Sequence, residues 1–252
     1  MSFSMKLFIQ AIWLLIFYAT GTIASESELE AIDLLRKAEA LMRSTGTIAE
    51  YQVDIIRPDW QRSMAFRSHD DVDKNRFRME ILSPRKTKGT VYLKVDNILS
   101  MYLPKLRRQI NISPAMMQDP WMGSDFNNQD LLETDSLISD YSHRIIQRDG
   151  SGNQAVITIE STPSPTAKVT WKQLIQRIRA DGIPLEMEYQ CEKRANRRMT
   201  FDLIQEMGGR LIPTRWTMTP LGDDGKRTVI TLKSIEFNVP LTDNLFAPDK
   251  RK

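Results

Sequence analysis

Two neighbouring stretches, RFRMEI (Arg76–Ile81) and VYLKVDNILSMYL (Val91–Leu103), decide how this 252-residue chain folds. Apolar side chains recur in both at every second position, and the second stretch is interrupted by the turn pair Asp96-Asn97. This alternation is typical of antiparallel strands that bury one face, and a short polar turn between two such runs indicates a hairpin. The two stretches therefore predict a meander of antiparallel strands.

The same period of two recurs on both sides of these stretches. Runs of this kind, each ended by turn residues, cover residues 53–55, 64–66, 143–148, 155–160, 174–179, 185–192, 200–207, 211–218 and 228–238. An antiparallel sheet of this size twists and curls. We therefore expect a mainly β (α+β) protein, built on a curled antiparallel sheet or half-open β-barrel of about 10–11 strands.

One helix precedes the strands. Ser25-x-x-Glu28 and Ser27-x-x-Glu30 both offer a capping box, apolar residues then recur at helical spacing as far as Met42, and Gly46 is a plausible terminator. An amphipathic helix needs an apolar surface to lie on. We expect this helix to help cover the apolar face of the sheet.

The stretch SPAMMQDPWMGSDFNNQDLL (Ser113–Leu132) carries large apolar side chains where a loop should be polar. Surface loops rarely expose this much apolar area, so the stretch must cover something or be covered. It either plugs the protein's own core or forms a lid over a ligand site. A short helix is expected from Asn127 or Asn128 to Leu132. The predicted lid or gate residues are Met117, Trp121, Met122 and Phe126.

Residues 1–24 have the pattern of a secretory signal peptide. Lys6 precedes an apolar run from Leu7 to Ala19, and small residues follow. Cleavage after Ala24 is favoured over cleavage after Gly21, and the alternative is an uncleaved membrane anchor. Residues 25–252 are then expected to form a single domain outside the cytoplasm.

Composition and motifs argue against several functions. The formal net charge of +3 is too near neutrality for general nucleic-acid binding, and the only cysteine, Cys191, excludes an internal disulfide. The two histidines, His69 and His143, lie far apart, and no zinc-binding or nucleophile motif occurs. The sequence therefore predicts a protein without metal or cofactor that is not an enzyme.

Basic residues cluster at 85–88, 105–108 and 193–198, all at strand ends or turns. One interpretation is that these are solvated turns and edges that charge keeps from aggregating. The other is a basic rim that meets anionic lipid headgroups or an acidic partner surface. The charge type allows the second interpretation, but the spacing does not require it.

Two motifs carry a family resemblance. PWMGSDF (Pro120–Phe126) followed by NQDL (Asn128–Leu131), and GRLIPTRW (Gly209–Trp216) with the closing NLF (Asn244–Phe246), resemble LolA-like outer-membrane lipoprotein-sorting proteins. The resemblance runs from about Ala31 to Pro248 and is strongest for a divergent subgroup with the MGSDF motif. It implies a LolA/LolB-like half-open barrel with a helical lid over an apolar cavity.

The function that this resemblance implies is a periplasmic carrier in a Gram-negative bacterium. It would bind acyl chains of lipoproteins or lipids for transfer towards the outer membrane, and the cavity would offset the cost of exposing acyl chains to water, about 0.8 kcal/mol per methylene. The expected lipid-binding cavity residues are Val53, Ile55, Met64, Phe66, Phe77, Met79, Val91, Leu93, Met101 and Leu103.

The alternative function is a periplasmic adaptor or sensor module that works with a membrane transporter of the resistance-nodulation-division (RND) type. The implied partners are lipoprotein acyl chains or lipid, an inner-membrane transporter of RND or Lol type, and an outer-membrane acceptor. The protein is expected to be a monomer. A carrier needs an open apolar cavity, whereas an adaptor could fill the cavity with its own side chains.

Overall fold

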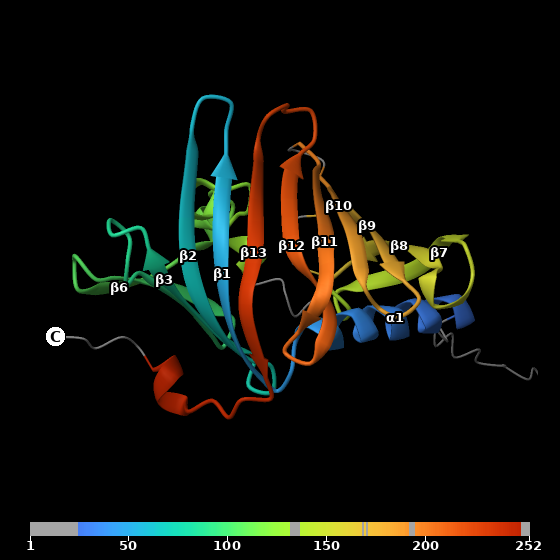
Figure 1. The fold of residues 1–252 in the computed structure, drawn as a ribbon, viewed down its shortest axis with the longest axis horizontal. Coiled ribbons are helices and arrows are strands. Elements are labelled where there is room, and N and C mark those ends of the chain that lie inside the picture. Colours follow the sequence, from blue (N-terminus) through green and yellow to red (C-terminus); the bar gives the residue numbers. More distant parts are fainter. Residues whose placement is uncertain (1–24, 132–136, 168, 170, 192–194, 248–252) are drawn as a thin grey trace, which may run out of the picture.

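The structure is a computed structural model that describes residues 25–131, 137–167, 169, 171–191 and 195–247. In this part of the chain, thirteen strands form one antiparallel sheet (Figure 1). The strands are β1 (Gly46–Ile56), β2 (Gln61–Asp71), β3 (Arg76–Ser83), β4 (Val91–Val95), β5 (Ile98–Leu103), β6 (Arg108–Asn111), β7 (Tyr141–Asp149), β8 (Val156–Pro163), β9 (Gln173–Arg179), β10 (Pro184–Gln190), β11 (Arg197–Met207), β12 (Arg210–Pro220) and β13 (Arg227–Phe237).

Two meanders meet at the centre of this sheet. The strand order is β6-β5-β4-β3-β2-β1-β13-β12-β11-β10-β9-β8-β7, so only the β1–β13 pair joins strands that are distant in sequence. The edge strands β6 and β7 are not paired with each other within the described residues, and the sheet is curled but not closed. The expected mainly β fold, built on a curled antiparallel sheet, is confirmed. It has thirteen strands where about ten or eleven were expected from strand patterns.

Local sequence explains the hairpins. Asp96 and Asn97, between β4 and β5, have φ of 51° and 61°, and Gly208 and Gly209, between β11 and β12, have φ of 61° and 76°. Two successive residues with positive φ match the right-handed twist of the flanking strands, and Asn, Asp and Gly tolerate that conformation best. Both predicted turns are therefore confirmed.

The helix α1 (Glu26–Met42) begins as predicted, because the Ser25 side chain accepts a hydrogen bond from the Glu28 amide. It ends four residues before Gly46, which instead opens β1. A Cβ at Gly46 would lie 2.0 Å from the backbone oxygen of Val239, so close backbone approach explains this glycine better than helix termination.

Two structures cover the inner face of the sheet, defined here as the face that carries Val53, Phe66 and Met79. Helix α1 covers the part formed by β7 to β9, where Ala31, Leu34 and Leu35 pack against the isoleucines of β8 and β9. The crossing segment, residues 113–131, leads away from edge strand β6 and covers the part formed by β1 to β5. Figure 1 shows this segment behind β1 and β2.

Some expectations fall outside the described residues. The predicted signal peptide, residues 1–24, lies there, as does Leu132 at the end of the expected short helix. The crossing segment contains three short 3-10 helices, Pro114–Met116, Trp121–Gly123 and Gln129–Leu131, and the last of them lies within the range of the expected short helix. Among the described residues, no helix is both long and apolar enough to cross a membrane.

Candidate functional site: an apolar cavity under the crossing segment

A cavity of about 410 Å³ lies between the inner face, helix α1 and the crossing segment. This volume falls within the range of small-molecule pockets, which are mostly apolar with few polar groups. Aromatic side chains form much of the wall, from both halves of the sheet and from the crossing segment: Tyr51, Phe66, Phe77, Trp121, Phe126, Tyr189, Phe201 and Trp216. The cavity can therefore take an apolar ligand that adapts to an irregular wall.

One part of the wall is polar. Arg43, at the end of α1, binds Asp70 of β2 through its Nε at 2.7 Å and Glu39 through its Nη1 at 3.0 Å. Lys94 of β4 is almost fully buried and lines the cavity as well. Burial raises the pKa of the nearby Tyr51 phenol well above its usual range, so it stays protonated. The cavity therefore offers charged groups to one portion of a ligand and apolar walls to the rest.

The predicted cavity residues divide into three groups. Phe66, Phe77 and Met79 line the cavity. Val53, Ile55 and Met64 share their inner face but are packed in the core cluster beneath Trp121, and Met101 packs against the same cluster. Leu103 falls on the inner face by its alternation with Met101, but it does not line the cavity.

Val91 and Leu93 correct the expected facing of β4. They pair with Glu80 and Arg78, whereas Tyr92 and Lys94 pair with Met79 and Phe77 of the inner face. Paired residues share a face, so Val91 and Leu93 lie on the opposite side of the sheet. That side is covered too, since Arg78 donates a hydrogen bond to the backbone oxygen of Leu245 in the C-terminal tail at 3.5 Å. Because both faces of β4 are buried, hydrophobicity did not distinguish them.

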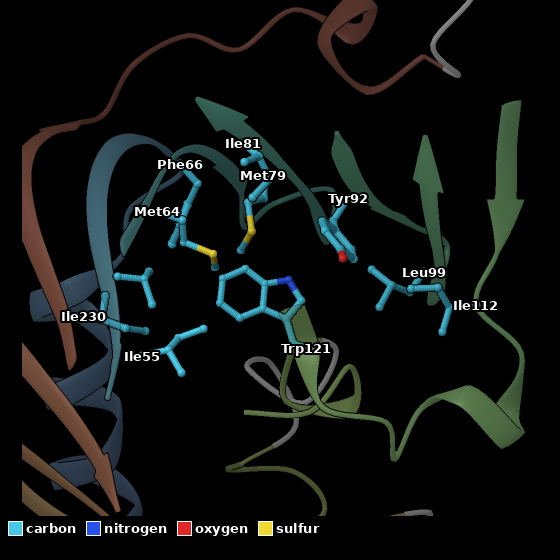
Figure 2. Packing of buried hydrophobic residues seen from close by; sticks show 11 residues of the cluster. Ile55, Met64, Phe66, Met79, Ile81, Tyr92, Leu99, Ile112, Trp121 and Ile230 are labelled. Atoms are coloured by element: carbon cyan, nitrogen blue, oxygen red, sulfur yellow. The ribbon is translucent and has the colours of Figure 1, made fainter. Parts of the chain in front are cut away.

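Trp121 anchors the crossing segment in the core. Its side chain is 2% exposed, and its ring meets Phe66 edge-on at 5.9 Å and Tyr92 at 6.3 Å between centroids. Figure 2 shows the six-membered ring directed at Ile55, Met64 and Ile230, with the indole nitrogen on the side of Tyr92. Trp121 thus belongs to the core, and its opposite surface forms part of the cavity wall.

The other predicted lid residues are less buried. Met117, Met122 and Phe126 are half-buried and pack against the same cluster. Of the three, only Phe126 lines the cavity. Met122 has φ of 52°, and Gly123 follows with φ of 74°, so the chain reverses directly after Trp121. Trp121 fills the core, as the core-plug interpretation expects, while Trp121 and Phe126 also bound the cavity. The lid role of these residues stays a prediction.

Asp125, in the middle of the MGSDF motif, fixes the segment to the centre of the sheet. Its carboxylate is bound by Arg57 from the β1–β2 turn at 3.1 Å and accepts a hydrogen bond from the Thr228 hydroxyl of β13 at 2.6 Å. The Arg57 and Asp125 side chains are 11% and 5% exposed. Arg57 also donates to the Gly123 carbonyl at 3.1 Å. The motif is therefore a docking element for the crossing segment.

Arg197 of β11 makes a second connection, to the far end of the segment. It binds both oxygens of Asp130 at 2.8 and 2.9 Å and donates to the Asp125 carbonyl at 2.7 Å. Its guanidinium lies 4.4 Å from the ring centre of Trp171 and 5.2 Å from that of Tyr189. Such planar stacking and two-point binding suit arginine and not lysine. The two buried pairs, Arg57–Asp125 and Arg197–Asp130, are called the docking pairs below.

Sequence reasoning missed both arginines of the docking pairs. Arg197 stood in a basic cluster where nothing separated it from Arg198, which is far more exposed. Arg57 stood in a turn that was notable only for its proline. The segment did carry one signal, because it has three aspartates among apolar residues, and any that are buried require cationic partners.

Polar groups elsewhere have structural roles. The Ser124 hydroxyl accepts a hydrogen bond from the Phe126 amide at 3.2 Å within its own turn. His143 is buried with its Nδ1 2.8 Å from the Ser161 hydroxyl and its Nε2 3.1 Å from the Ile138 carbonyl. Burial lowers the pKa of His143, which favours the neutral ring. The described residues contain no group of three or more His, Cys, Asp or Glu side chains suited to a metal ion.

Solved structures share this architecture. A DUF1329 family protein from Desulfovibrio piger is 20% identical, with a TM-score of 0.75 over 88% of this chain and 98% of that chain. A domain from Vibrio parahaemolyticus, described as an outer membrane lipoprotein-sorting protein, is 21% identical, with a TM-score of 0.73 over 87% of this chain and 97% of its own. A LolA superfamily protein from Nitrosomonas europaea is 16% identical, with a TM-score of 0.71 over 86% and 97%.

Sequence comparisons give a family but no described activity. No curated protein matches the chain. A family model with the description "Uncharacterized protein" matches residues 73–250, which is more than half of the chain. The solved structures agree with the resemblance carried by the sequence motifs at the level of fold. The chain therefore belongs to the family whose model covers residues 73–250, and its fold is similar to that of the LolA superfamily protein from Nitrosomonas europaea.

Proposed function

We propose that this protein is a periplasmic carrier that binds acyl chains of lipids or lipoproteins in its cavity for transfer towards the outer membrane. The observation that carries the proposal is the cavity of about 410 Å³, lined by aromatic and aliphatic side chains beneath the crossing segment. Burying an acyl chain there recovers about 0.8 kcal/mol for each methylene removed from water. The LolA-like fold supports the same proposal.

The polar part of the wall suggests how an amphiphile is oriented. Arg43 and its partner Asp70 line the cavity, as does Lys94, and Trp121, Phe126 and Trp216 contribute to the apolar lining. A polar headgroup costs free energy when buried without partners, so the ligand's head belongs beside the charged side chains. The acyl chain then lies along the aromatic wall.

Release of cargo requires the crossing segment to move. The two docking pairs hold this segment to the β1–β2 turn and to β11, so movement has to break both. Breaking a buried pair is costly unless water or another partner compensates the charges. In this proposal a membrane partner lowers that cost, and no cofactor or bond-making chemistry is involved.

The test is ligand binding by a cavity-filling variant of α1 and its matched control. Ala38 lines the cavity, whereas Ala40, two residues further along the same helix, is exposed. Ala38→Trp should weaken binding of a fluorescent fatty acid at least tenfold, and Ala40→Trp should leave it unchanged. Equal binding by both variants would contradict the proposal.

Mass spectrometry of the protein purified from its own membrane extract gives the cargo. An acyl-bearing lipid or lipoprotein is the expected result. Recovery of one membrane transporter in stoichiometric amounts, without lipid and without saturable probe binding, would instead favour the adaptor function. The same purification tests the export route, since the mature chain should begin at Ser25.

A further inference from the structure

Two turns at the β6 edge of the sheet lie side by side. Residues 84–90 connect β3 to β4, and residues 104–107 connect β5 to β6. A Cβ placed on Gly89 would lie 3.6 Å from the Pro104 side chain, so the turns are in near contact. Figure 1 shows them at the end of the molecule's long axis opposite β7 and the helix α1.

These turns, with the first residue of β6, form a strongly basic surface. The basic edge patch is defined as Arg85, Lys86, Lys88, Lys105, Arg107 and Arg108, all of them exposed. Neither turn contains an acidic residue. No ion pair joins any of the six side chains to a carboxylate in the described part of the chain, whereas Arg43, Arg57, Arg76 and Arg197 are all paired. Six adjacent cations are thus left to solvent or a partner.

Edge protection explains little of this surface. Charge on an edge strand prevents other strands from pairing with its open backbone groups. Only Arg108 lies in the edge strand β6, while the other five cations lie in the two turns, where no strand edge is exposed. The chain carries a formal net charge of +3, so everything outside the patch sums to −3. Such polarity directs this end of the molecule towards a negative surface.

An apolar side chain lies at the tip of one turn. Leu106 is 64% exposed, more than any other large apolar residue of the described chain, and it stands between Lys105 and Arg107. A surface of anionic phospholipids accommodates both features, because cations reach the phosphates while an apolar side chain enters the interface. An acidic protein surface would explain the cations but not the protruding leucine.

We propose that the basic edge patch docks the protein on a membrane surface of anionic phospholipids. The β6 strand leads from the patch directly into the crossing segment at Ser113, so docking places the cover of the cavity beside the membrane. The docking itself does not depend on the cavity binding an acyl chain.

The experiment is flotation of the whole mature protein with vesicles of phosphatidylcholine mixed with phosphatidylglycerol, compared with phosphatidylcholine alone. Wild-type protein should bind only the anionic vesicles, and salt should weaken the binding. Each basic residue near an anionic surface contributes about 1 kcal/mol, so Lys86→Gln with Lys105→Gln should weaken binding about 30-fold.

The matched control removes two exposed cations elsewhere, by Arg177→Gln in β9 with Lys233→Gln in β13. It has the same net charge as the patch variant and should change binding less than about threefold. Equal loss in the two double variants would overturn the patch as the docking surface. Failure of the wild-type protein to prefer anionic vesicles would overturn membrane docking altogether.

Leu106→Ser separates a lipid surface from an acidic protein. It leaves the charge unchanged and should weaken vesicle binding about tenfold, because a leucine side chain no longer enters the interface. Unchanged vesicle binding by this variant would contradict the role assigned to Leu106. Fatty-acid binding should be normal in all these variants, so failure of membrane docking is distinguishable from failure of the carrier function.

Discussion

Helix α1 and the crossing segment cover the same inner face by different means. The helix presents a stripe of Ala31, Leu34 and Leu35 to the isoleucines of β8 and β9. Its Glu30–Arg148 ion pair to the sheet is about half exposed, and Arg43 just beyond its end binds Asp70 with side chains 12% and 19% exposed. The crossing segment inserts one large side chain, Trp121, and relies on buried ion pairs. Along most of its length the helix is held by apolar contact, whereas the crossing segment depends on a few specific contacts.

From this difference we expect the crossing segment, and not α1, to be the cover that moves. Apolar contact is non-directional and roughly proportional to the area removed from water, so it needs no single partner group. A buried ion pair is strong only in its docked geometry, and once broken it must be solvated or matched by another partner. The crossing segment therefore has a defined docked state, whereas α1 behaves as part of the wall.

Replacement of Trp121 should have the largest effect on this comparison. Trp121→Ala removes a buried indole from the core cluster and should lower the free energy of unfolding by about 3–5 kcal/mol. Met122→Ala should cost less than about 1 kcal/mol, since Met122 is only half-buried beside it. Chemical denaturation of both variants measures the two costs. Similar costs would mean that the segment is held along its whole length.

Disruption of a docking pair comes next. Asp125→Ala leaves Arg57 buried without its carboxylate and should destabilise the protein by about 3 kcal/mol. Removal of the exposed pair on α1, by Glu30→Ala, should cost less than about 1 kcal/mol. Two double-mutant cycles isolate the interaction energies. One combines Asp125→Ala with Arg57→Met for the docking pair, and the other combines Glu30→Ala with Arg148→Met for the exposed pair. Equal coupling energies would remove the distinction between the two covers.

Truncation of the apolar stripe on α1 should have a smaller effect. Leu34→Ala removes a buried side chain that does not line the cavity and should cost about 2–3 kcal/mol. Because the helix belongs to the wall, fatty-acid exchange should keep its wild-type rate. Stopped-flow exchange of a fluorescent fatty acid checks this. If Leu34→Ala accelerated the exchange as much as Asp125→Ala does, α1 would be a moving cover too.

The smallest expected effect is the pH dependence of the unfolding free energy that comes from the buried His143. Burial lowers the pKa of His143 below its ordinary value of 6.5, so the unfolded chain binds more protons than the folded one as the pH falls below that value. Stability should therefore be full above pH 6.5 and decline as the pH falls towards the lowered pKa. His69 has a lowered pKa as well and adds to the same trend. His143→Gln should flatten the pH profile of the unfolding free energy, and an unchanged profile would show that His143 does not contribute.

Sequence predicted the parts of the fold that depend on local pattern. Strand alternation, the Asp96-Asn97 turn and the Ser25 cap all follow from contacts within a few residues. β6 was missed because Arg-Gln-Ile-Asn is too short and polar to show a buried face. Val91 and Leu93 were assigned to the inner face because a strand buried on both sides gives no facing signal.

The candidate site was harder to predict. Alternation placed Phe66, Phe77 and Met79 on one face and the resemblance implied a cavity there, but much of the cavity wall comes from β9 to β12, which no local pattern connects with β1 to β4. The docking arginines lie 68 and 67 residues from their aspartates in sequence. Contacts of that range depend on the complete sheet, and one sequence read locally does not contain them.

The pairing of β1 with β13 affects how the chain folds. Thr47 pairs with Phe237, so the central ladder joins residues from nearly opposite ends of the polypeptide. Contacts of such long sequence separation form slowly, because the entropy of closing a long loop is lost before the contacts stabilise the chain. A nascent chain that lacks β13 cannot form this ladder, so β1 and β12 both lack the strand that joins them. The two halves of the sheet are therefore joined only after nearly the whole chain has been made.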